Sequence, residues 1–188
     1  RWASQPPVSA KALAEVAKRW GVARTRWALE LCFDTLYGWN TWLFTQRRET
    51  PLGLLSYGHS PYAAYAPDGT SNAAYPRGCN DESGLDNGPT VENVPCNQTG
   101  LGLQDQYSAG YSGLFLMDAE ANAEIADMLG RTEVAVELRR RAQIVRDAMV
   151  ATLWNASLGA FQNALSGSIG APTPITRMSP THFYPVLG

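Results

Sequence analysis

The amino-acid sequence predicts an all-α fold in which buried inner helices pair with more polar outer helices, as in an α/α toroid. Three observations predict this fold. Two long stretches, at about residues 24–45 and 104–129, are apolar on nearly every face. A charged stretch with a single apolar stripe follows the second of them across a Gly-Arg turn, as expected of an outer helix. Between the two apolar stretches, residues 47–103 are dense in Gly, Pro, Asn and Asp.

The composition indicates one globular domain. The chain of 188 residues is 45% hydrophobic and 17% charged, and 15 Lys and Arg against 17 Asp and Glu leave a net charge of −2. Nucleic acids and anionic membranes are bound by clustered Lys and Arg, so this balance argues against both as partners. No apolar run is long enough for a transmembrane helix. The chain has no initiator Met and ends in what resembles the opening of another element, so we expect residues 1–188 to be part of a domain cut at both ends.

The first two helices are predicted from their apolar spacing. Residues 9–20 predict a short amphipathic helix with Ser9 as its cap and Gly21 as its stop. Its expected apolar stripe is Leu13, Val16 and Trp20. Residues 24–45 carry aromatic and aliphatic side chains nearly all round, which predicts an inner helix buried on most sides.

The second helix pair follows the long loop. Residues 104–129 have apolar side chains at spacings of three and four and end at Gly130, which predicts another inner helix. Thr132 is expected to cap an outer helix that runs to about Leu153. The expected apolar stripe of this outer helix is Val134, Leu138, Ile144 or Val145, and Met149. Residues 158–162 predict a small strand or turn that closes the pair.

The loop between the inner helices is long for a compact domain. Segments of this length without regular structure are usually functional or disordered. Residues 47–103 hold several Leu and Tyr side chains, enough apolar surface to pack, which favours an ordered, site-forming loop.

The cysteines and histidines show no metal-ligand spacing, so we predict neither a metal site nor a cofactor. Cys32 lies in an apolar helical stretch and is interpreted as a core residue. Cys79 and Cys96 flank one segment of the long loop and either form a disulfide or stay free. Sequons at Asn97 and Asn155 permit N-glycosylation. These features favour a secreted protein or one of the secretory-pathway lumen, and leave the compartment open.

A cluster of carboxylates lies in the long loop at residues 81–89, which read Asp-Glu-Ser-Gly-Leu-Asp-Asn-Gly-Pro. Residue types and spacing leave two interpretations open. Asp86 and Asn87 could simply turn the backbone. Alternatively, a carboxyl group on this Gly-bracketed loop, beside Leu85 and several aromatics, could be desolvated enough to donate a proton near neutral pH.

Residues 82–89 resemble the general-acid motif Glu-Ser-Gly-(Leu/Met)-Asp-Asn of glycoside hydrolase family 63 α-glucosidases and their mannosylglycerate- and glucosylglycerate-hydrolase relatives. Residues 52–58 are similar to the family segment that ends an inner helix and lines the sugar pocket. Residues 179–185 are similar to the opening of the family's next inner helix. The resemblance implies part of an (α/α)6 toroid with a long ordered active-site loop. It also implies an oligosaccharide or glycoside as substrate, no cofactor, and the rest of the same toroid as structural partner.

Carried over residue by residue, the resemblance implies that Asp86 is the general acid that protonates the departing glycosidic oxygen. Glu82 and Asn87 would orient Asp86 or bind sugar hydroxyls, and Tyr57 would form an aromatic wall of the pocket. The family inverts the anomeric configuration, so a second carboxylate must activate a water from the opposite face. We find no candidate for this base and expect it outside the chain, which would leave the isolated fragment inactive.

Two more residues are candidates for contact with the sugar. His59 lies in a Gly- and Pro-flanked turn, where a plain turn residue is the alternative. Tyr111 begins the second inner helix, where core packing is the alternative. The sequence departs from the family pattern at Gly88 and Thr90, which puts the subsite preference in doubt. Two other functions stay open: a trehalase-like toroid glycosidase, and a catalytically silent helical carbohydrate-binding module.

Overall fold

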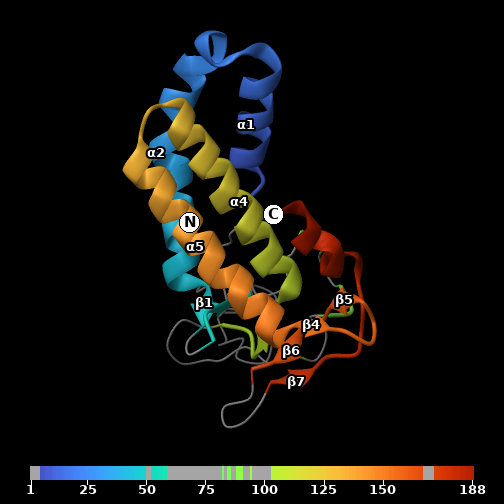
Figure 1. The fold of residues 1–188 in the computed structure, drawn as a ribbon. Coiled ribbons are helices and arrows are strands. Elements are labelled where there is room, and N and C mark those ends of the chain that lie inside the picture. Colours follow the sequence, from blue (N-terminus) through green and yellow to red (C-terminus); the bar gives the residue numbers. More distant parts are fainter. Residues whose placement is uncertain are drawn as a thin grey trace, which may run out of the picture.

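The structure is a computed structural model of the chain, and it describes residues 5–49, 52–58, 82, 84–85, 88–90, 94, 103–166 and 172–188. Helices make up most of these residues (Figure 1), which confirms the predominantly helical prediction. The closed toroid stays a prediction. The described helices are α1 (Ser9–Trp20), α2 (Val22–Gln46), α4 (Ala109–Met128), α5 (Thr132–Thr152) and the 3-10 helix η1 (Pro180–Leu187).

Helices α1 and α2 form a hairpin around Gly21, as predicted. The φ angle of Gly21 is 90°, a conformation that glycine adopts without steric cost, and its N–H closes α1 by donating to the Ala17 carbonyl at 2.9 Å. The predicted cap is wrong, because Ser9 is already helical and Val8 precedes it without a side-chain hydrogen bond. Thr132 is likewise the first residue of α5 rather than its cap.

The buried face of α1 differs from the predicted stripe. Its fully buried residues are Ala10, Ala14 and Ala17, whereas Val16 and Trp20 are exposed. Residues four and seven apart lie on one helix face, so the three alanines form a smooth strip that packs against α2 and α4. The small side chains let the helices approach closely, and of the predicted stripe only Leu13 packs partly buried against the core.

Helix α2 is less buried than predicted. Trp27 and Leu31 are 70% and 72% exposed, because α1 and α4 cover only one side of the first half of the helix. The second half is better covered, and there Trp39, Trp42 and Phe44 pack partly buried against the core.

Helix α4 is the buried helix predicted at residues 104–129, but it begins only at Ala109, because residues 106–107 form a strand and the Ser108 side chain caps the helix by accepting from the Tyr111 N–H. It packs against α1, α2, α5 and η1 (Figure 1), and nearly every residue from Ala109 to Ala126 is buried. Its N-terminal half meets η1 at two glycines. A Cβ on Gly110 would lie 2.7 Å from the Thr181 carbonyl oxygen, and one on Gly113 would lie 2.5 Å from the Pro185 nitrogen. These positions need glycine because the backbones themselves are in contact.

Helix α5 runs back beside α4 after a turn at Gly130. Its buried stripe includes Leu138, Val145 and Met149, as predicted, with Val145 rather than Ile144 facing inward. The more polar outer face carries most of the charged residues of the helix, whereas Arg141 is buried.

Short antiparallel sheets gather at one end of the helices, drawn at the bottom of Figure 1. Strand β1 (Arg48–Glu49) pairs with β2 (Leu54–Leu55), and β4 (Trp154–Asn155) pairs with β5 (Ala160–Phe161). A three-stranded sheet has the order β3 (Gln106–Tyr107), β6 (Ala164–Leu165) and β7 (Thr173–Pro174). The β4–β5 hairpin confirms the small strand predicted at residues 158–162.

The buried residues form two hydrophobic clusters along the helices. The cluster at the sheet end includes Leu43, Leu54, Tyr57, Tyr111 and Phe115. The other cluster joins the α1 alanines to Leu29, Phe33, Ile125 and Leu138. In the part of the chain that the structure describes, no helix has the length and apolar character needed to cross a bilayer.

Candidate functional site

A buried ion pair joins the end of α2 to the predicted acid motif. Arg47 follows α2 directly and is 6% exposed, and Glu82 is 1% exposed. The Arg47 Nε lies 2.8 Å from Glu82 Oε2, and its Nη2 lies 2.9 Å from Glu82 Oε1. This two-point contact fixes the plane of the carboxylate as well as its position.

Gly58 completes the contacts of Glu82. The Gly58 N–H donates to Glu82 Oε2 at 2.6 Å. A Cβ at Gly58 would lie 2.0 Å from the Arg47 Cζ, so the guanidinium occupies the space that any side chain would need. On its other side the Arg47 guanidinium lies 4.4 Å from the centre of the Trp42 ring, which adds a cation–π contact.

Tyr57 and Tyr111 lie beside this ion pair in the core. Their ring centroids are 4.8 Å apart, and their exposed fractions are 1% and 0%. Burial raises the pKa of the Tyr57 hydroxyl, against the opposing effect of a hydrogen bond with Ser108. The structure thus brings the two predicted sugar-contacting tyrosines together, with Tyr57 near Glu82, but it places their rings in the hydrophobic core. Their contact with a sugar stays a prediction.

Three of the predicted site residues, Asp86, Asn87 and His59, lie outside the described residues. So do the predicted disulfide partners Cys79 and Cys96 and the sequon residue Asn97. The residues on either side of positions 86 and 87 are described: the Gly88 N–H donates to the Leu85 carbonyl at 3.1 Å. Gly84 has a φ of 71°, and a Cβ there would lie 2.7 Å from Pro6 Cγ.

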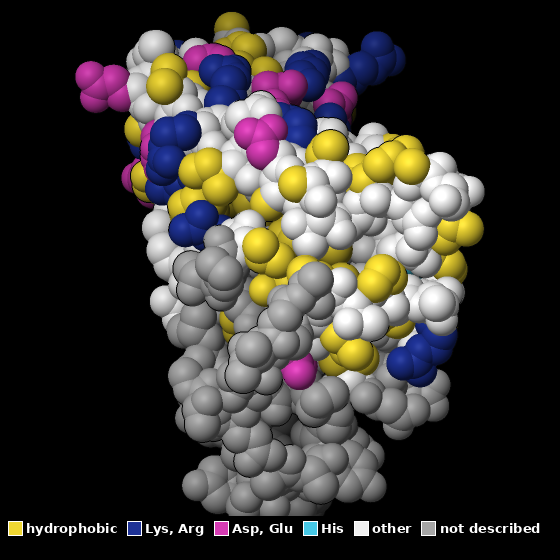
Figure 2. Space-filling view, turned by 60° about the horizontal axis from the view of Figure 1, so that its bottom comes forward, with side chains coloured by type: hydrophobic (Ala, Val, Ile, Leu, Met, Phe, Trp, Pro, Cys, Tyr) yellow, Lys and Arg dark blue, Asp and Glu magenta, His cyan; other side chains and the backbone are white. Residues whose placement is uncertain are grey.

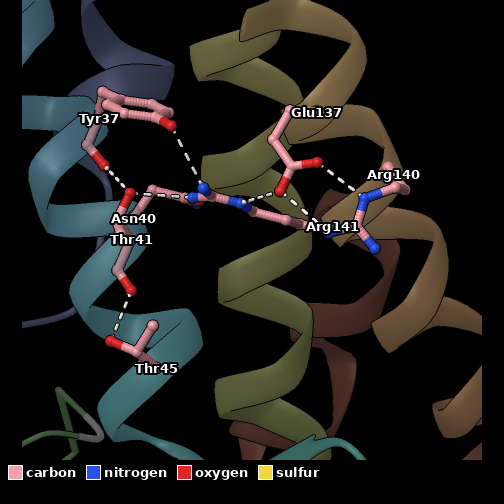
Figure 3. Close-up of polar contacts among 7 residues, drawn as sticks. All are labelled: Tyr37, Asn40, Thr41, Thr45, Glu137, Arg140 and Arg141. Atoms are coloured by element: carbon pink, nitrogen blue, oxygen red, sulfur yellow. Dashed lines mark hydrogen bonds and ion pairs between the residues drawn. The ribbon is translucent and has the colours of Figure 1, made fainter.

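A second buried polar cluster crosses the helices at Asp118, which is 2% exposed on α4. Asn40 of α2 donates its Nδ2 to Asp118 Oδ2 at 2.8 Å and accepts a bond from Arg141 Nη1 of α5 at 3.2 Å. Burial raises the pKa of Asp118 to about 7, although hydrogen bonds from Asn40 and Asn122 act in the opposite direction. Figure 3 shows Arg141 reaching from α5 to Tyr37, Asn40 and Thr41 on α2.

Several carboxylates on the helix surfaces are engaged in ion pairs. Glu120 pairs with Arg146, Asp127 with Arg139, and Glu124 with Lys18, all across exposed or half-exposed contacts. Glu137 contacts Arg140 and Arg141 (Figure 3). Hydrogen bonds, first from Arg140 and then from Arg141, lower the pKa of Glu137 to about 2. Such surface pairs are typical of solvated helix faces.

The sheet end also carries a pocket of about 210 Å³, lined by residues 152–156 and 162–164 and by Pro174. Asn155, the second sequon residue, lies in its wall and donates to Gln162 Oε1 at 2.7 Å.

Figure 2, which turns this end of the molecule toward the viewer, shows hydrophobic side chains scattered over its described part, with charged side chains of both signs gathered mostly at the upper edge. The described residues include no group of three or more His, Cys, Asp and Glu side chains that could hold a metal ion.

The roles of Arg47 and Gly58 could not be predicted from the sequence. Arg47 stands 35 positions before its partner Glu82, so no local pattern connects the two. Gly58 lies in the segment that resembles a family motif. Position 58 must be glycine because the Arg47 side chain fills the space beside it, and this contact cannot be read from the sequence. Asp118 was visible as a polar residue on an apolar helix, and its partners on α2 and α5 could not be found by spacing.

Comparison with known proteins places this arrangement in a family. Among curated proteins none matches the chain. Among solved structures, an uncharacterized conserved protein from Thermus thermophilus has a similar fold, with a TM-score of 0.65 and 16% sequence identity. The match covers 98% of this chain and 48% of that protein, so the chain spans about half the length of the structure it resembles. The model of the mannosylglycerate hydrolase MGH1-like glycoside hydrolase domain matches residues 1–187. The chain therefore belongs to this family of glycoside hydrolase domains.

Proposed function

We propose that this domain contributes the general acid of an inverting glycoside hydrolase that cleaves α-glucosidic or α-mannosidic bonds. The observation that carries the proposal is the match of nearly the whole chain to a glycoside hydrolase domain family. The name of that family makes mannosylglycerate one substrate to be tested.

Asp86 is the proposed acid. As a neutral carboxylic acid it would donate its proton to the glycosidic oxygen while the bond to the anomeric carbon breaks. A water would attack that carbon from the opposite face, activated by a carboxylate at roughly 6.5–9.5 Å from the acid. Glu120, Asp127 and Glu137 on α4 and α5 are held in ion pairs and are poorly suited to this role, and we propose that the base lies outside this chain.

The proposed position of Asp86 is supported by its described neighbours. Glu82 is clamped four residues before it, and Leu85 and Gly88 on either side of positions 86 and 87 are joined by a hydrogen bond. Each Glu82 oxygen already accepts two hydrogen bonds, so we assign Glu82 to orienting the acid segment rather than to binding a sugar hydroxyl.

The experiment compares Asp86→Asn with the parent in the full-length protein that contains this chain. Substrates are 4-nitrophenyl α-D-glucopyranoside, 4-nitrophenyl α-D-mannopyranoside and mannosylglycerate. We expect kcat on mannosylglycerate to fall by roughly 10²–10⁴-fold, because a positioned proton donor contributes that much. α-D-Glucopyranosyl fluoride should be affected far less, because fluoride leaves without protonation. Nuclear magnetic resonance of the first-formed sugar should show the inverted anomer.

The matched control is Asp127→Asn, which removes a carboxylate from an exposed ion pair on α4 and should keep the parental kcat. The acid assignment is wrong if Asp86→Asn hydrolyses the unactivated glycoside as fast as the parent. A retained anomeric configuration in the parent's product would contradict the inverting mechanism.

A further inference from the structure

Burying the Arg47–Glu82 ion pair costs free energy, because both charges lose their contact with water. Charges taken out of water are stabilised only when their geometry is good and their hydrogen bonds are complete. Here both conditions are met. Glu82 Oε1 accepts from Arg47 Nε and Nη2 at 3.1 and 2.9 Å, and Oε2 accepts from Arg47 Nε and the Gly58 N–H at 2.8 and 2.6 Å.

Arg47 is itself held by the rigid part of the fold. Its backbone N–H donates to the Leu43 carbonyl as the end of α2, and its carbonyl accepts from the Ser56 N–H at 2.8 Å. The guanidinium stacks on Trp42 and donates from Nη1 to the Gln46 carbonyl at 3.2 Å. The side chain is therefore a fixed extension of α2 that ends at the Glu82 carboxylate.

Glu82 in turn limits where the proposed acid lies. Four residues of chain span at most roughly 14 Å, so a fixed Glu82 sets an upper limit on how far the acid-bearing segment can move from it. The segment has a second anchor at Gly84, which packs against Pro6. We infer that Arg47 is a positioning residue that acts through Glu82 to hold the acid-bearing segment in place. This inference rests on the proposed function, and it adds a residue that neither the sequence nor the family resemblance singled out.

The test measures steady-state kinetics of the full-length protein on mannosylglycerate, whose alcohol leaving group needs the proton of the acid. Because a displacement of about 1 Å can cost roughly 100-fold in rate, we expect Arg47→Met to lower kcat by at least tenfold. KM should change by less than threefold, because Arg47 does not contact the sugar in this inference. Arg47→Lys keeps the charge but loses the two-point contact. Its kcat should therefore lie between that of the parent and that of Arg47→Met.

The pH profile separates positioning from a merely structural role. Glu82→Gln leaves the Arg47 cation without its counter-charge near the acid, which should lower the pKa of Asp86 and move the alkaline limb of kcat/KM to lower pH. Arg47→Met should not move that limb downward. A general loss of folding would change both variants in the same way.

Amide hydrogen exchange across residues 82–90 tests the anchor without using activity. Exchange should be faster in Arg47→Met and unchanged in Arg139→Met, which breaks an exposed ion pair and serves as the matched control. If thermal melting shows that Arg47→Met does not fold, the same kinetic and exchange measurements are made on Arg47→Lys and Glu82→Gln. The inference is overturned if folded variants at both positions keep kcat within twofold of the parent and the same exchange. Full activity of Asp86→Asn would instead overturn the proposed function.

Discussion

Gly58 shows how one missing side chain permits the buried ion pair. The guanidinium of Arg47 fills the space where a Cβ would stand, so Gly58→Ala must displace it from Glu82, from Trp42 or from both. Overpacking of this kind costs roughly 1–3 kcal/mol. We expect the free energy of unfolding to fall by about that amount, measured by urea denaturation followed by tryptophan fluorescence.

Gly38→Ala is the matched control at the same scale. Gly38 lies inside α2, and nothing lies within 4 Å of the position its Cβ would take. Alanine favours a helix over glycine by up to about 1 kcal/mol, so this variant should be more stable than the parent. A Gly58→Ala variant as stable as the parent would show that the Arg47 side chain can rearrange without loss.

At the scale of elements, α4 carries a buried carboxyl group between α2 and α5. The groups that face Asp118 are Asn40 of α2, Arg141 of α5 through Asn40, and Asn122 one turn further along α4. Asn122 Oδ1 is a buried acceptor without a hydrogen-bond partner. The Asn122 Nδ2 donates to the Asp118 backbone carbonyl at 2.9 Å, and burial of the carboxyl group itself favours its protonated form.

The stability of the chain should therefore depend on pH through Asp118. Below its ordinary pKa of 3.8 both the folded and the unfolded states hold the proton, and between 3.8 and about 7 only the folded state does. The free energy of unfolding therefore decreases as the pH rises through this window, by at most about 4 kcal/mol, and no further loss follows above it.

Asp118→Asn isolates this contribution, because every other titrating group is common to both proteins. As the pH rises from 4 to 7.5, the parent should lose stability relative to Asp118→Asn. The free energy of unfolding of both proteins is measured by urea denaturation at fixed ionic strength. A difference that does not change with pH would show that Asp118 titrates near its ordinary value.

The elements also show how far the sequence could predict the structure. Residues 104–129 were predicted to form an inner helix because their apolar side chains recur around the whole helix, and the observed helix runs from Ala109 to Met128. The burial of α1 was mispredicted because alanine gives little signal of its own, and only the neighbouring α2 and α4 reveal that Ala10, Ala14 and Ala17 face inward. Contacts between distant positions, such as Arg47 with Glu82, have no local pattern at all.

At the scale of the whole molecule, the described part of the chain leaves large apolar side chains in solvent. Trp27 and Leu31, one helical turn apart on α2, are 70% and 72% exposed, and on η1 Phe183 and Val186 are also exposed. Scattered apolar residues are ordinary on a protein surface, but pairs at positions i and i+4 form a continuous strip. The strip on α2 lies on a helix of 25 residues, whereas η1 has 8.

We therefore expect the isolated 188-residue chain to self-associate through the Trp27–Leu31 strip, because contact between two such strips removes apolar surface from water. Sedimentation velocity at increasing concentration should show a rising mass for the parent and a monomer for the double variant Trp27→Arg, Leu31→Glu. Val136→Glu is the matched control: Val136 is 60% exposed on α5, and its replacement should leave the association unchanged. A parent that stays monomeric at all concentrations would show that the strip is tolerated in water. Equal loss of association in the control would show that a charged replacement of any exposed apolar residue is enough, and that the effect does not belong to this strip.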